Sequence, residues 1–382
     1  MNEQDAAAQA APGFNQFPCS NCGSSLLFAP GAAQLKCPHC GTENRIETDE
    51  TDESHLTEHD FLSELERQNS QQQEAPDTPE AEAVRCTNCG ATTTVTRDRT
   101  ADRCPYCDSP LVIQNAFSLK LNVQALLPFV VESQTAHASY RKWLESRWFA
   151  PNDFRRRATR EESLKGMYMP FWTYDAHTRT SYRGERGDAY YVTNTVTVQR
   201  NGKMVQEQRQ ERRIRWSNAS GTVNVPFDDV LVPASSSLPT DLQDSLAPWP
   251  LEKLKPFRQE FLSGFVTETY QVPLEKGFEG AKNRMEPVIT RHIRADIGGD
   301  EQRIHSKETR YSKITYKHIL LPVWTSAYRY KAKTYRFIIN AQTGEVSGNR
   351  PWSAWKIAGA ILGGLALAAS IIHLLETTGV LN

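Results

Sequence analysis

The longest uninterrupted apolar run of the chain is found at residues 357–375, which read IAGAILGGLALAASIIHLL and include no Asp, Glu, Lys or Arg. As a helix rising about 1.5 Å per residue, this run would be about 28 Å long, close to the thickness of a bilayer's hydrocarbon core. Only a helix satisfies its own backbone hydrogen bonds there. The pattern predicts one transmembrane helix, with a buried helix of a soluble core as the alternative.

The residues around this run predict its orientation. Trp352 and Trp355 precede it, as interfacial aromatic residues do, and Arg350 and Lys356 lie on the same side, whereas Glu376 alone carries charge after it. This asymmetry places the N-terminal side in the cytoplasm, and no apolar signal peptide precedes the body. We expect a tail-anchored, single-pass protein of the inner (cytoplasmic) membrane with its N-terminus in the cytoplasm.

Small residues form one face of the predicted transmembrane helix. Gly359 and Gly363 have the GxxxG spacing, and Ala360 and Gly364 extend the same face. Such a face lets two helices approach closely. We therefore weigh a homodimer through Gly359 and Gly363 against a helix that contacts lipid alone.

Residues 113–350 combine the two other periodicities. Strand-like alternation flanks Asn201-Gly202, which is a strong signal of a tight β-hairpin. Helical periodicity appears at 135–149 and at 275–293, where Pro287 predicts an interruption. We expect an α+β body with an antiparallel sheet.

One short pattern occurs twice in this body. Met169-Pro-Phe-Trp-Thr173 and Leu321-Pro-Val-Trp-Thr325 share Pro, Trp and Thr, and each leads into a strand rich in Tyr and Arg. Tryptophan is more often buried than exposed at a site. We interpret Trp172 and Trp324 as core anchors of a duplicated β-unit, with a ligand groove as the alternative.

The eight cysteines form two copies of one spacing, C-x2-C-x14-C-x2-C. The first copy contains Cys19, Cys22, Cys37 and Cys40, and the second contains Cys86, Cys89, Cys104 and Cys107. Two Cys-x-x-Cys loops offer four thiolates to one ion, so each copy predicts a zinc ribbon with a closed, structural Zn²⁺. Gly23, Gly41 and Gly90 follow three of these loops, where a left-handed turn is needed. A redox role for the cysteine pairs is the weaker alternative.

Charge is divided unevenly along the chain. Residues 1–83 carry 16 acids and 3 bases, whereas residues 119–382 carry 37 bases and 26 acids. The acidic segment repels a polyanion and neither ribbon has a basic stripe, which disfavours nucleic-acid binding. The basic body favours an anionic lipid surface as its neighbour, with an ordinary solvated surface as the alternative.

The stretch between the ribbons is acidic, rich in Gln and short of aliphatic residues, which predicts disorder over most of it. A short helix at 57–67 is the exception, because Phe61, Leu62 and Leu65 form one apolar face after Asp60. We hypothesise that this helix docks a partner, with a transient helix as the alternative.

These patterns divide the chain into five units. The units are zinc ribbon 1 at 15–45, the linker at 46–83, zinc ribbon 2 at 84–112, the body at 113–350 and the membrane anchor at 351–382. The chain has no P-loop, no His-Glu-x-x-His and no Gly-x-Ser-x-Gly, and every cysteine is assigned to metal. We expect no enzymatic activity, no catalytic residue and no organic cofactor.

Several segments together carry a resemblance to a known family. They are the ribbon knuckles, WLESRWFAP at 143–151, YMPFWTYD at 168–175, LLPVW at 320–324 and YRFIINAQTG at 335–344. Over about residues 15–360 the chain resembles a bacterial family of TFIIB-type zinc-ribbon membrane proteins. Members are often labelled primosomal protein N-prime (replication factor Y), superfamily II helicase, but this chain lacks the nucleotide-binding loop and is too short for two motor domains. The resemblance implies company with membrane-stress and SPFH-type scaffold proteins.

We therefore expect a membrane-tethered, non-enzymatic adaptor whose two ribbons, on an acidic flexible arm, recruit protein partners to the cytoplasmic face of the membrane. The alternative is a nucleic-acid-binding zinc-ribbon protein anchored at the membrane, without helicase activity of its own. A third hypothesis is an enzyme with a site beside Trp172 or Trp324.

Overall fold

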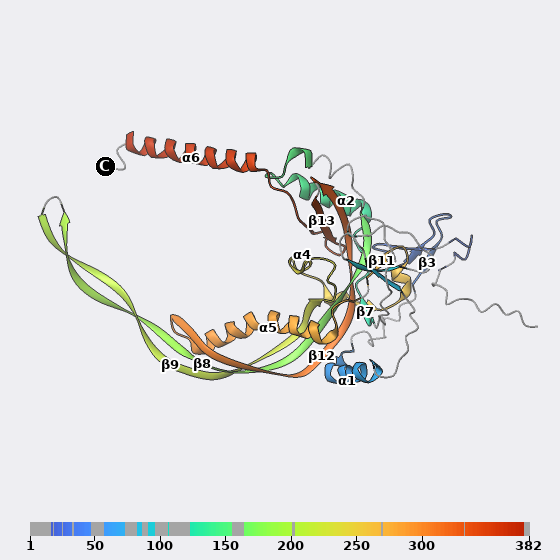
Figure 1. Ribbon diagram of the computed structural model, residues 1–382, viewed down its shortest axis with the longest axis horizontal. Helices are drawn as coiled ribbons and strands as arrows, with labels where there is room; N and C mark the ends of the chain where they lie inside the picture. Colours follow the sequence, from blue (N-terminus) through green and yellow to red (C-terminus); the bar gives the residue numbers. More distant parts are fainter. Residues whose placement is uncertain are drawn as a thin grey trace, which may run out of the picture.

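The computed structural model describes residues 17, 19–24, 26–32, 34–46, 57–72, 82–85, 91–95, 106, 123–154, 164–200, 203–268, 270–331 and 333–377. Three long strands dominate the body and curve together across it (Figure 1). They are β8 (Lys165–Arg200), β9 (Lys203–Pro233) and β12 (Glu301–Tyr330). β8 pairs antiparallel with both of the others and is therefore the central strand of the three. The expected body with an antiparallel sheet is confirmed.

Shorter elements surround these strands. The same sheet contains β4 (His59–Asp60), β7 (Ala125–Leu126), β10 (Lys255–Pro256), β11 (Val266–Thr267), β13 (Lys333–Asn340) and β14 (Val346–Gly348). Among the described residues, the α-helices of five or more residues are α1 (Phe61–Gln72), α2 (Ser133–Glu145), α4 (Thr240–Asp244), α5 (Leu274–Ile297) and α6 (Ala354–Thr377). The 3-10 helices of this part of the chain are η2 (Leu251–Lys253) and η3 (Gln259–Leu262). The hairpin expected around 201–202 is the β8–β9 pair, whose ladder extends to Arg200 opposite Lys203.

The helix predicted at 275–293 is longer than expected. α5 continues unbroken through Pro287, so the predicted interruption is wrong. Proline removes one backbone hydrogen bond from a helix. The buried Met285 and Ile289 flank this position, and burial of that face against the sheet outweighs the single lost bond.

The two Pro-x-Trp motifs begin at facing positions on the neighbouring strands β8 and β12. Their first residues, Met169 and Leu321, are directly opposite each other in the β8–β12 ladder, so the motifs run away from this point in opposite directions. Trp172 is 3% exposed and Trp324 is 7% exposed. The prediction that both tryptophans are core residues is confirmed.

Each tryptophan also makes the same hydrogen bond to the start of a helix. The indole N–H of Trp172 donates to the carbonyl of Val272 at 2.9 Å, and that of Trp324 donates to the carbonyl of Val131 at 2.8 Å. Each valine lies two positions before the first residue of a helix, which is α5 for Val272 and α2 for Val131. The regions around Trp172 and Trp324 are therefore equivalent in structure well beyond the short Pro-x-Trp motif.

The body consists of two equivalent β-α-β-β units. The first is β7, α2, β8 and β9, and the second is β11, α5, β12 and β13. β7 pairs in parallel with β12 and β11 pairs in parallel with β8, so each unit gives its first strand to the other. Equivalent backbone bonds recur, with Ala234 N–H donating to Pro170 at 3.0 Å and Ala341 N–H donating to Pro322 at 3.1 Å. The duplicated β-unit predicted from the sequence is therefore a pair of units that exchange their first strands.

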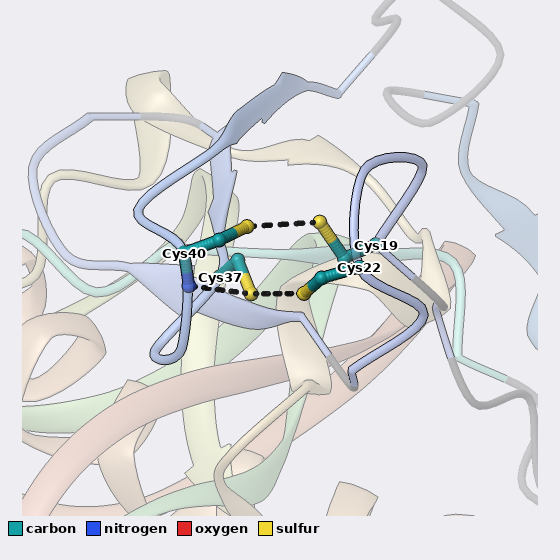
Figure 2. Close-up of side chains that lie close together, drawn as sticks. All are labelled: Cys19, Cys22, Cys37 and Cys40. Carbon is teal, nitrogen blue, oxygen red and sulfur yellow. Dashed lines mark hydrogen bonds between the residues drawn. The ribbon is translucent and has the colours of Figure 1, made fainter.

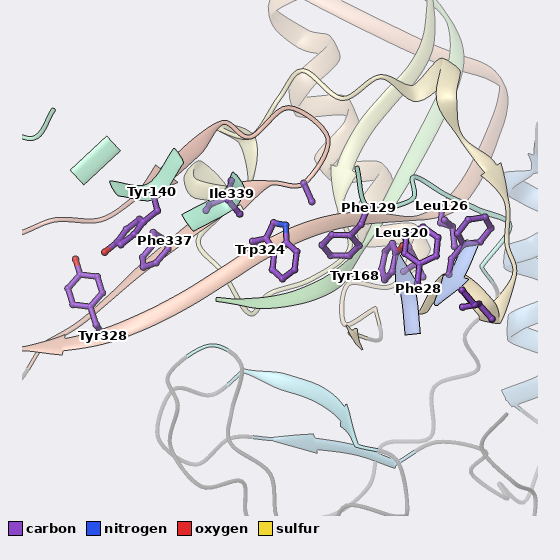
Figure 3. Close-up of a cluster of buried hydrophobic side chains, with 14 of the residues drawn as sticks. Phe28, Leu126, Phe129, Tyr140, Tyr168, Leu320, Trp324, Tyr328, Phe337 and Ile339 are labelled. Carbon is purple, nitrogen blue, oxygen red and sulfur yellow. The ribbon is translucent and has the colours of Figure 1, made fainter. Parts of the chain in front are cut away.

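A large aromatic cluster connects the sheet with α2 and with the first ribbon. The ring of Tyr140 on α2 stacks on Phe337 of β13 with centroids 3.8 Å apart, and Phe129 stacks on Phe265 at 3.9 Å. Phe28, which lies in the first ribbon, belongs to the same cluster (Figure 3). Aromatic side chains bury large areas, so this cluster fixes α2 and the first ribbon on the sheet.

The helix expected at 57–67 is present as α1, but it docks on the chain's own body. The carboxylate of Asp60 accepts a hydrogen bond from the backbone N–H three residues later at 2.8 Å, which caps the first turn. Phe61 is 5% exposed and its ring lies 4.9 Å from that of Phe278, whereas Leu62 is 60% exposed. The apolar face that we assigned to an external partner is therefore partly covered by the body, where Phe61 meets Phe278 of α5 and Tyr174 of β8.

α6 contains the predicted membrane anchor. Residues Ala354–Leu375 form a helix that is long and apolar enough to cross a membrane, and none of it is buried in the protein. The Lys356 ammonium, in the first turn, donates to the carbonyls of Trp148 and Ala150 at 3.0 and 2.8 Å. The helix therefore leaves the body from a fixed point (Figure 1). Its large apolar side chains are exposed.

Candidate metal centre

The first cysteine set lies in a small three-stranded antiparallel sheet. Its strands are β1 (Leu27–Ala29), β2 (Gln34–Lys36) and β3 (Glu43–Arg45). Cys19 and Cys22 precede β1, and Cys37 and Cys40 occupy the turn from β2 to β3. The fold of this segment therefore brings two Cys-x-x-Cys loops to the same end of one ribbon.

The two loops have the same backbone geometry. Gly23 N–H donates to the carbonyl of Cys19 at 2.8 Å, and Gly41 N–H donates to the carbonyl of Cys37 at 3.0 Å. The glycines have φ of 70° and 75°, which confirms the left-handed turn predicted for both. Glycine adopts this conformation without the steric cost that a side chain would add, so both loops close tightly around their sulfur atoms.

The four sulfur atoms converge on one point (Figure 2). All four lie within 4.8 Å of one another, and the Cys19–Cys40 and Cys22–Cys37 sulfur pairs are both 3.5 Å apart. A tetrahedral site with metal–sulfur bonds of about 2.3 Å requires sulfur separations of about 3.8 Å, whereas a disulfide requires about 2.05 Å. The first set is therefore a four-cysteine group that can hold a metal ion.

Local hydrogen bonds favour the thiolate form of one ligand. The Thr42 hydroxyl lies 3.1 Å from the Cys40 sulfur, and hydrogen bonds from the side chain and backbone of Thr42 lower the pKa of Cys40 to about 5. The backbone N–H of Cys40 donates to the sulfur of Cys37 at 3.4 Å. Metals bind thiolates and not thiols, so these contacts prepare the loop for a cation.

The ligand set also limits the chemistry of this site. Cys19 and Cys37 are buried, Cys22 and Cys40 are exposed, and none of the four forms a disulfide. Four thiolates fill a tetrahedral shell and leave no position for water or substrate. A metal held here organises the ribbon and supplies no catalytic step.

Ribbon 1 is attached to the body by specific contacts. Phe28 N–H donates to the carbonyl of Ser263 at 3.0 Å, and the Ser263 hydroxyl donates to the carbonyl of Leu26 at 2.6 Å. A cavity of about 340 Å³ lies along this contact and is bordered by Leu27 and Trp324. The first ribbon is part of the body's surface in this structure, in contrast to the expected position on a flexible arm.

The second cysteine set was predicted with the same spacing. Cys86, Cys89, Cys104, Cys107 and Gly90 all lie outside the described residues, as do linker residues 47–56 and 73–81, which we expected to be disordered. The described parts are the antiparallel strands β5 (Glu82–Arg85) and β6 (Thr92–Val95), together with Ala91 and Tyr106. The second zinc ribbon therefore stays a prediction.

A buried carboxylate, which we did not predict, holds Tyr106 on the body. Tyr106, which is fully buried, donates a hydrogen bond from its hydroxyl to Glu268. Ser235 donates to Glu268 at 2.7 Å and the Gln271 amide donates at 2.5 Å. Burial raises the pKa of Glu268 to about 7, even though these hydrogen bonds and one from Ser237 oppose the shift. No sequence signal marks Glu268, since it lies in an alternating stretch typical of an exposed strand.

The duplicated unit supplies an internal comparison for Glu268. Its N–H donates to the carbonyl of Tyr168 at 3.0 Å, and in the other unit Leu127 N–H donates to Leu320 at 3.0 Å. Leu127 is fully buried among apolar residues. The equivalent position of the other unit thus holds a buried leucine, so the β-α-β-β fold does not require a carboxylate there. We attribute the carboxylate of Glu268 to its contact with Tyr106.

No family model matches the chain. The chain is similar to the uncharacterized protein YdjG of Bacillus subtilis (strain 168), with 28% identity over 280 residues that cover 70% of this chain and 76% of the relative. No solved structure matches. The similarity to YdjG covers most of both chains, and the name of that protein assigns no activity to it.

Proposed function

We propose that this chain is a membrane-tethered, non-enzymatic adaptor that recruits protein partners to the cytoplasmic face of the inner membrane. The observation that carries the proposal is α6, since a predominantly apolar span of 22 residues is left unburied by a chain that has its own aromatic core. Such a helix is stable where lipid covers it. The resemblance to TFIIB-type zinc-ribbon membrane proteins supports the same function.

The proposed cofactors are two structural Zn²⁺ ions. The first is held by Cys19, Cys22, Cys37 and Cys40, and the second by Cys86, Cys89, Cys104 and Cys107. The all-thiolate composition favours Zn²⁺ over Mg²⁺ or Ca²⁺, which prefer oxygen ligands. Closed sites of this kind suit a recognition module, which agrees with the absence of common catalytic motifs from the sequence.

The attachment of ribbon 1 shapes how a partner would be recognised. The Phe28 and Ser263 contacts hold the ribbon against the body, so a partner meets a composite surface and not a mobile finger. Leu27 is 41% exposed at the edge of this surface. Preorganised surfaces lose less entropy on binding, which favours an adaptor that holds a partner stably.

The alternative is a nucleic-acid-binding protein anchored at the membrane. In the described part of ribbon 1, Lys36 is paired with Glu43 at 3.4 Å, which neutralises one of the few bases available for phosphate contacts. Phosphate binding by a few cations depends steeply on salt. Protein recruitment is therefore the proposal, and nucleic-acid binding is an outcome that its test can detect.

The test is co-purification of the full chain from solubilised membranes. The unchanged protein is compared with a Cys86→Ser/Cys89→Ser variant and with Thr87→Ser, a control within the same loop. We expect the double variant to lose the second zinc ion and a defined set of partners that the control retains. Membrane-stress and SPFH-type scaffold proteins are the first candidates for these partners. An identical partner set in all three samples contradicts the proposal, and partners released by nuclease or moderate salt support the alternative.

A carbonate wash tests the tether separately. We expect the full chain to stay with the membrane pellet at high pH, because an inserted apolar helix has no favourable route into water. A chain that ends before α6 is the comparison. Release of the full chain by carbonate contradicts the membrane part of the proposal and leaves the metal sites unaffected.

A further inference from the structure

The β8–β9 hairpin continues well beyond the rest of the sheet. β12 begins at Glu301, opposite Gly187, so residues 188–200 and 203–215 continue as two strands alone. We call this part the arm. At about 3.3 Å per residue it is about 43 Å long, and it projects past α5 and β12 at the far end of the sheet (Figure 1).

The arm lacks the support that usually stabilises a hairpin. A two-stranded ribbon is marginally stable in water, and a third strand or a packed helix is normally needed. Among the described residues, β9 pairs with β8 alone, and α5 ends at Ile297, near the base of the arm. A partner that covers one face of the arm would supply the missing contacts.

Strand alternation separates the arm into two different faces. The first, which we call the valine face, carries Asp188, Tyr190, Val192, Asn194, Val196, Val198, Val205, Glu207, Arg209, Glu211, Arg213 and Arg215. The second, which we call the glutamine face, carries Ala189, Tyr191, Thr193, Thr195, Thr197, Met204, Gln206, Gln208, Gln210, Arg212 and Ile214. Hydrogen bonds from Asn194 and Arg213 to Glu211, at 3.0 and 3.1 Å, place these side chains on one face. The valine face thus combines exposed apolar groups with ordered charges.

The order of charges on the valine face is self-complementary. Glu207, Arg209, Glu211 and Arg213 alternate in sign along β9. Under a two-fold axis at position 210, Glu207 meets Arg213 of a second copy and Arg209 meets Glu211 of that copy. An antiparallel pair of identical strands therefore matches these four charges with their opposites, and this pairing is the mark of an isologous contact.

We propose that a second copy of this chain covers the valine face of the arm in an antiparallel arrangement. The same axis places Val196 against Tyr190 of the second copy, so apolar groups meet beside the charged row. A face of about 43 by 10 Å buries about 900 Å² in total, which is small for a stable dimer. The arm contact is therefore weak alone and acts where tethered copies are concentrated at a membrane.

The first test is site-specific photocrosslinking of the full chain in membranes. A photoreactive phenylalanine analogue replaces Asn194 on the valine face or, as the matched control, Thr193 on the glutamine face. We expect a covalent dimer from position 194 that is at least about five times more abundant than that from position 193. Equal yields at both positions, or no dimer at 194, overturn the proposal.

The second test uses the charge order. Arg213→Glu places two carboxylates together across the axis and is expected to lower the crosslink from position 194 about tenfold, while Glu207→Arg/Arg213→Glu in one chain restores it. Arg212→Glu changes the charge equally on the other face, and Arg212 also loses an exposed ion pair, with Glu301 at 3.0 Å. Failure of the double variant to recover, or an equal loss with Arg212→Glu, contradicts the two-fold arrangement.

Metal binding and membrane retention are measured on the same samples. Neither the adaptor proposal nor the metal sites involve the arm, so both are expected to be unchanged in the charge variants. A loss of dimer with normal zinc content and normal membrane retention therefore concerns the arm alone.

Discussion

The hydroxyl of Tyr106 donates a hydrogen bond to the carboxylate of Glu268, and both residues are fully buried. Tyr106 lies between two cysteines of the second set, at 104 and 107, whereas Glu268 follows a short strand of the body. This bond joins parts of the chain that are 162 residues apart. Tyr106 is therefore bonded to the body, and Ala91 packs in the same apolar cluster as residues of the sheet.

Removal of the Tyr106 hydroxyl is expected to destabilise the protein. Tyr106→Phe keeps the ring but leaves Glu268 with one donor fewer in a buried site, which costs about 1–3 kcal/mol. Denaturant unfolding of the full chain in detergent measures the change. Tyr191→Phe, at a position that is 65% exposed, is the control and is expected to have no effect. An equal stability of all three proteins would show that the bond contributes nothing.

Glu268 also predicts a pH dependence of stability. Its pKa is raised by burial to about 7, above that of an exposed glutamate, so the folded protein holds a proton that the unfolded chain releases. Stability therefore falls as the pH rises from about 4.5 to about 7, by up to about 3 kcal/mol.

Glu268→Gln tests this dependence because its amide cannot titrate. Asp175, whose pKa burial and Glu58 raise to about 7, contributes to the same window in both proteins and cancels in the difference. We expect the stability difference between Glu268→Gln and the unchanged chain to vary across that window. Parallel curves at every pH would refute the assignment.

The docking of α1 predicts a contrast between two adjacent residues. Phe61→Ala removes a buried ring from contact with Phe278 and is expected to cost about 3–4 kcal/mol, whereas Leu62→Ala removes a side chain that is 60% exposed and is expected to cost less than about 0.5 kcal/mol. Thermal unfolding and limited proteolysis report on both variants. Similar behaviour of the two would favour an external partner for the whole helix face.

Thr42 is expected to influence metal uptake without being a ligand. Its hydrogen bonds lower the pKa of Cys40 to about 5, so Thr42→Val raises that pKa toward its ordinary value. Protons then compete more strongly with the metal, and half-loading of the first site moves to higher pH. Zinc content measured across a pH series tests this, with Thr87→Ser as a control. An unchanged midpoint means that Thr42 does not tune the site.

Gly277 illustrates a close approach between helix and sheet. A Cβ at this position would lie 2.8 Å from Trp172 and would overlap the Tyr174 hydroxyl. Gly277→Ala gains about 1 kcal/mol in helix propensity, but the clash is expected to leave the protein about 2 kcal/mol less stable. Gly280→Ala, whose Cβ would lie 3.0 Å from Val232, is expected to be milder. Chemical denaturation separates these two outcomes.

Local chemistry made part of this structure predictable. Gly23 and Gly41 follow their cysteines because the loops require positive φ, which glycine adopts readily. Trp172 and Trp324 are large apolar residues within strand-like sequence, so their burial could be predicted from the neighbouring residues. The same is true of the apolar composition of α6.

Long-range contacts account for what the sequence did not reveal. The burial of Phe61 depends on Phe278, more than 200 positions away, and helix α5 passes through Pro287 because the sheet covers its apolar face. The burial of Glu268 depends on donors from two distant segments, which supply Tyr106 and Ser235. Periodicity and spacing carry no information about such partners.

The exchange of first strands between the two β-α-β-β units has a consequence for folding. β7 is completed by β12 and β11 by β8, while α5 packs on β8 and β9 of the other unit. A break in the polypeptide between the units would thus leave two fragments, each without a strand partner that it needs. Each fragment would supply the partner that the other lacks. Such halves should behave as obligate complementing pieces, like the subunits of an intertwined dimer that has been fused into a single gene product.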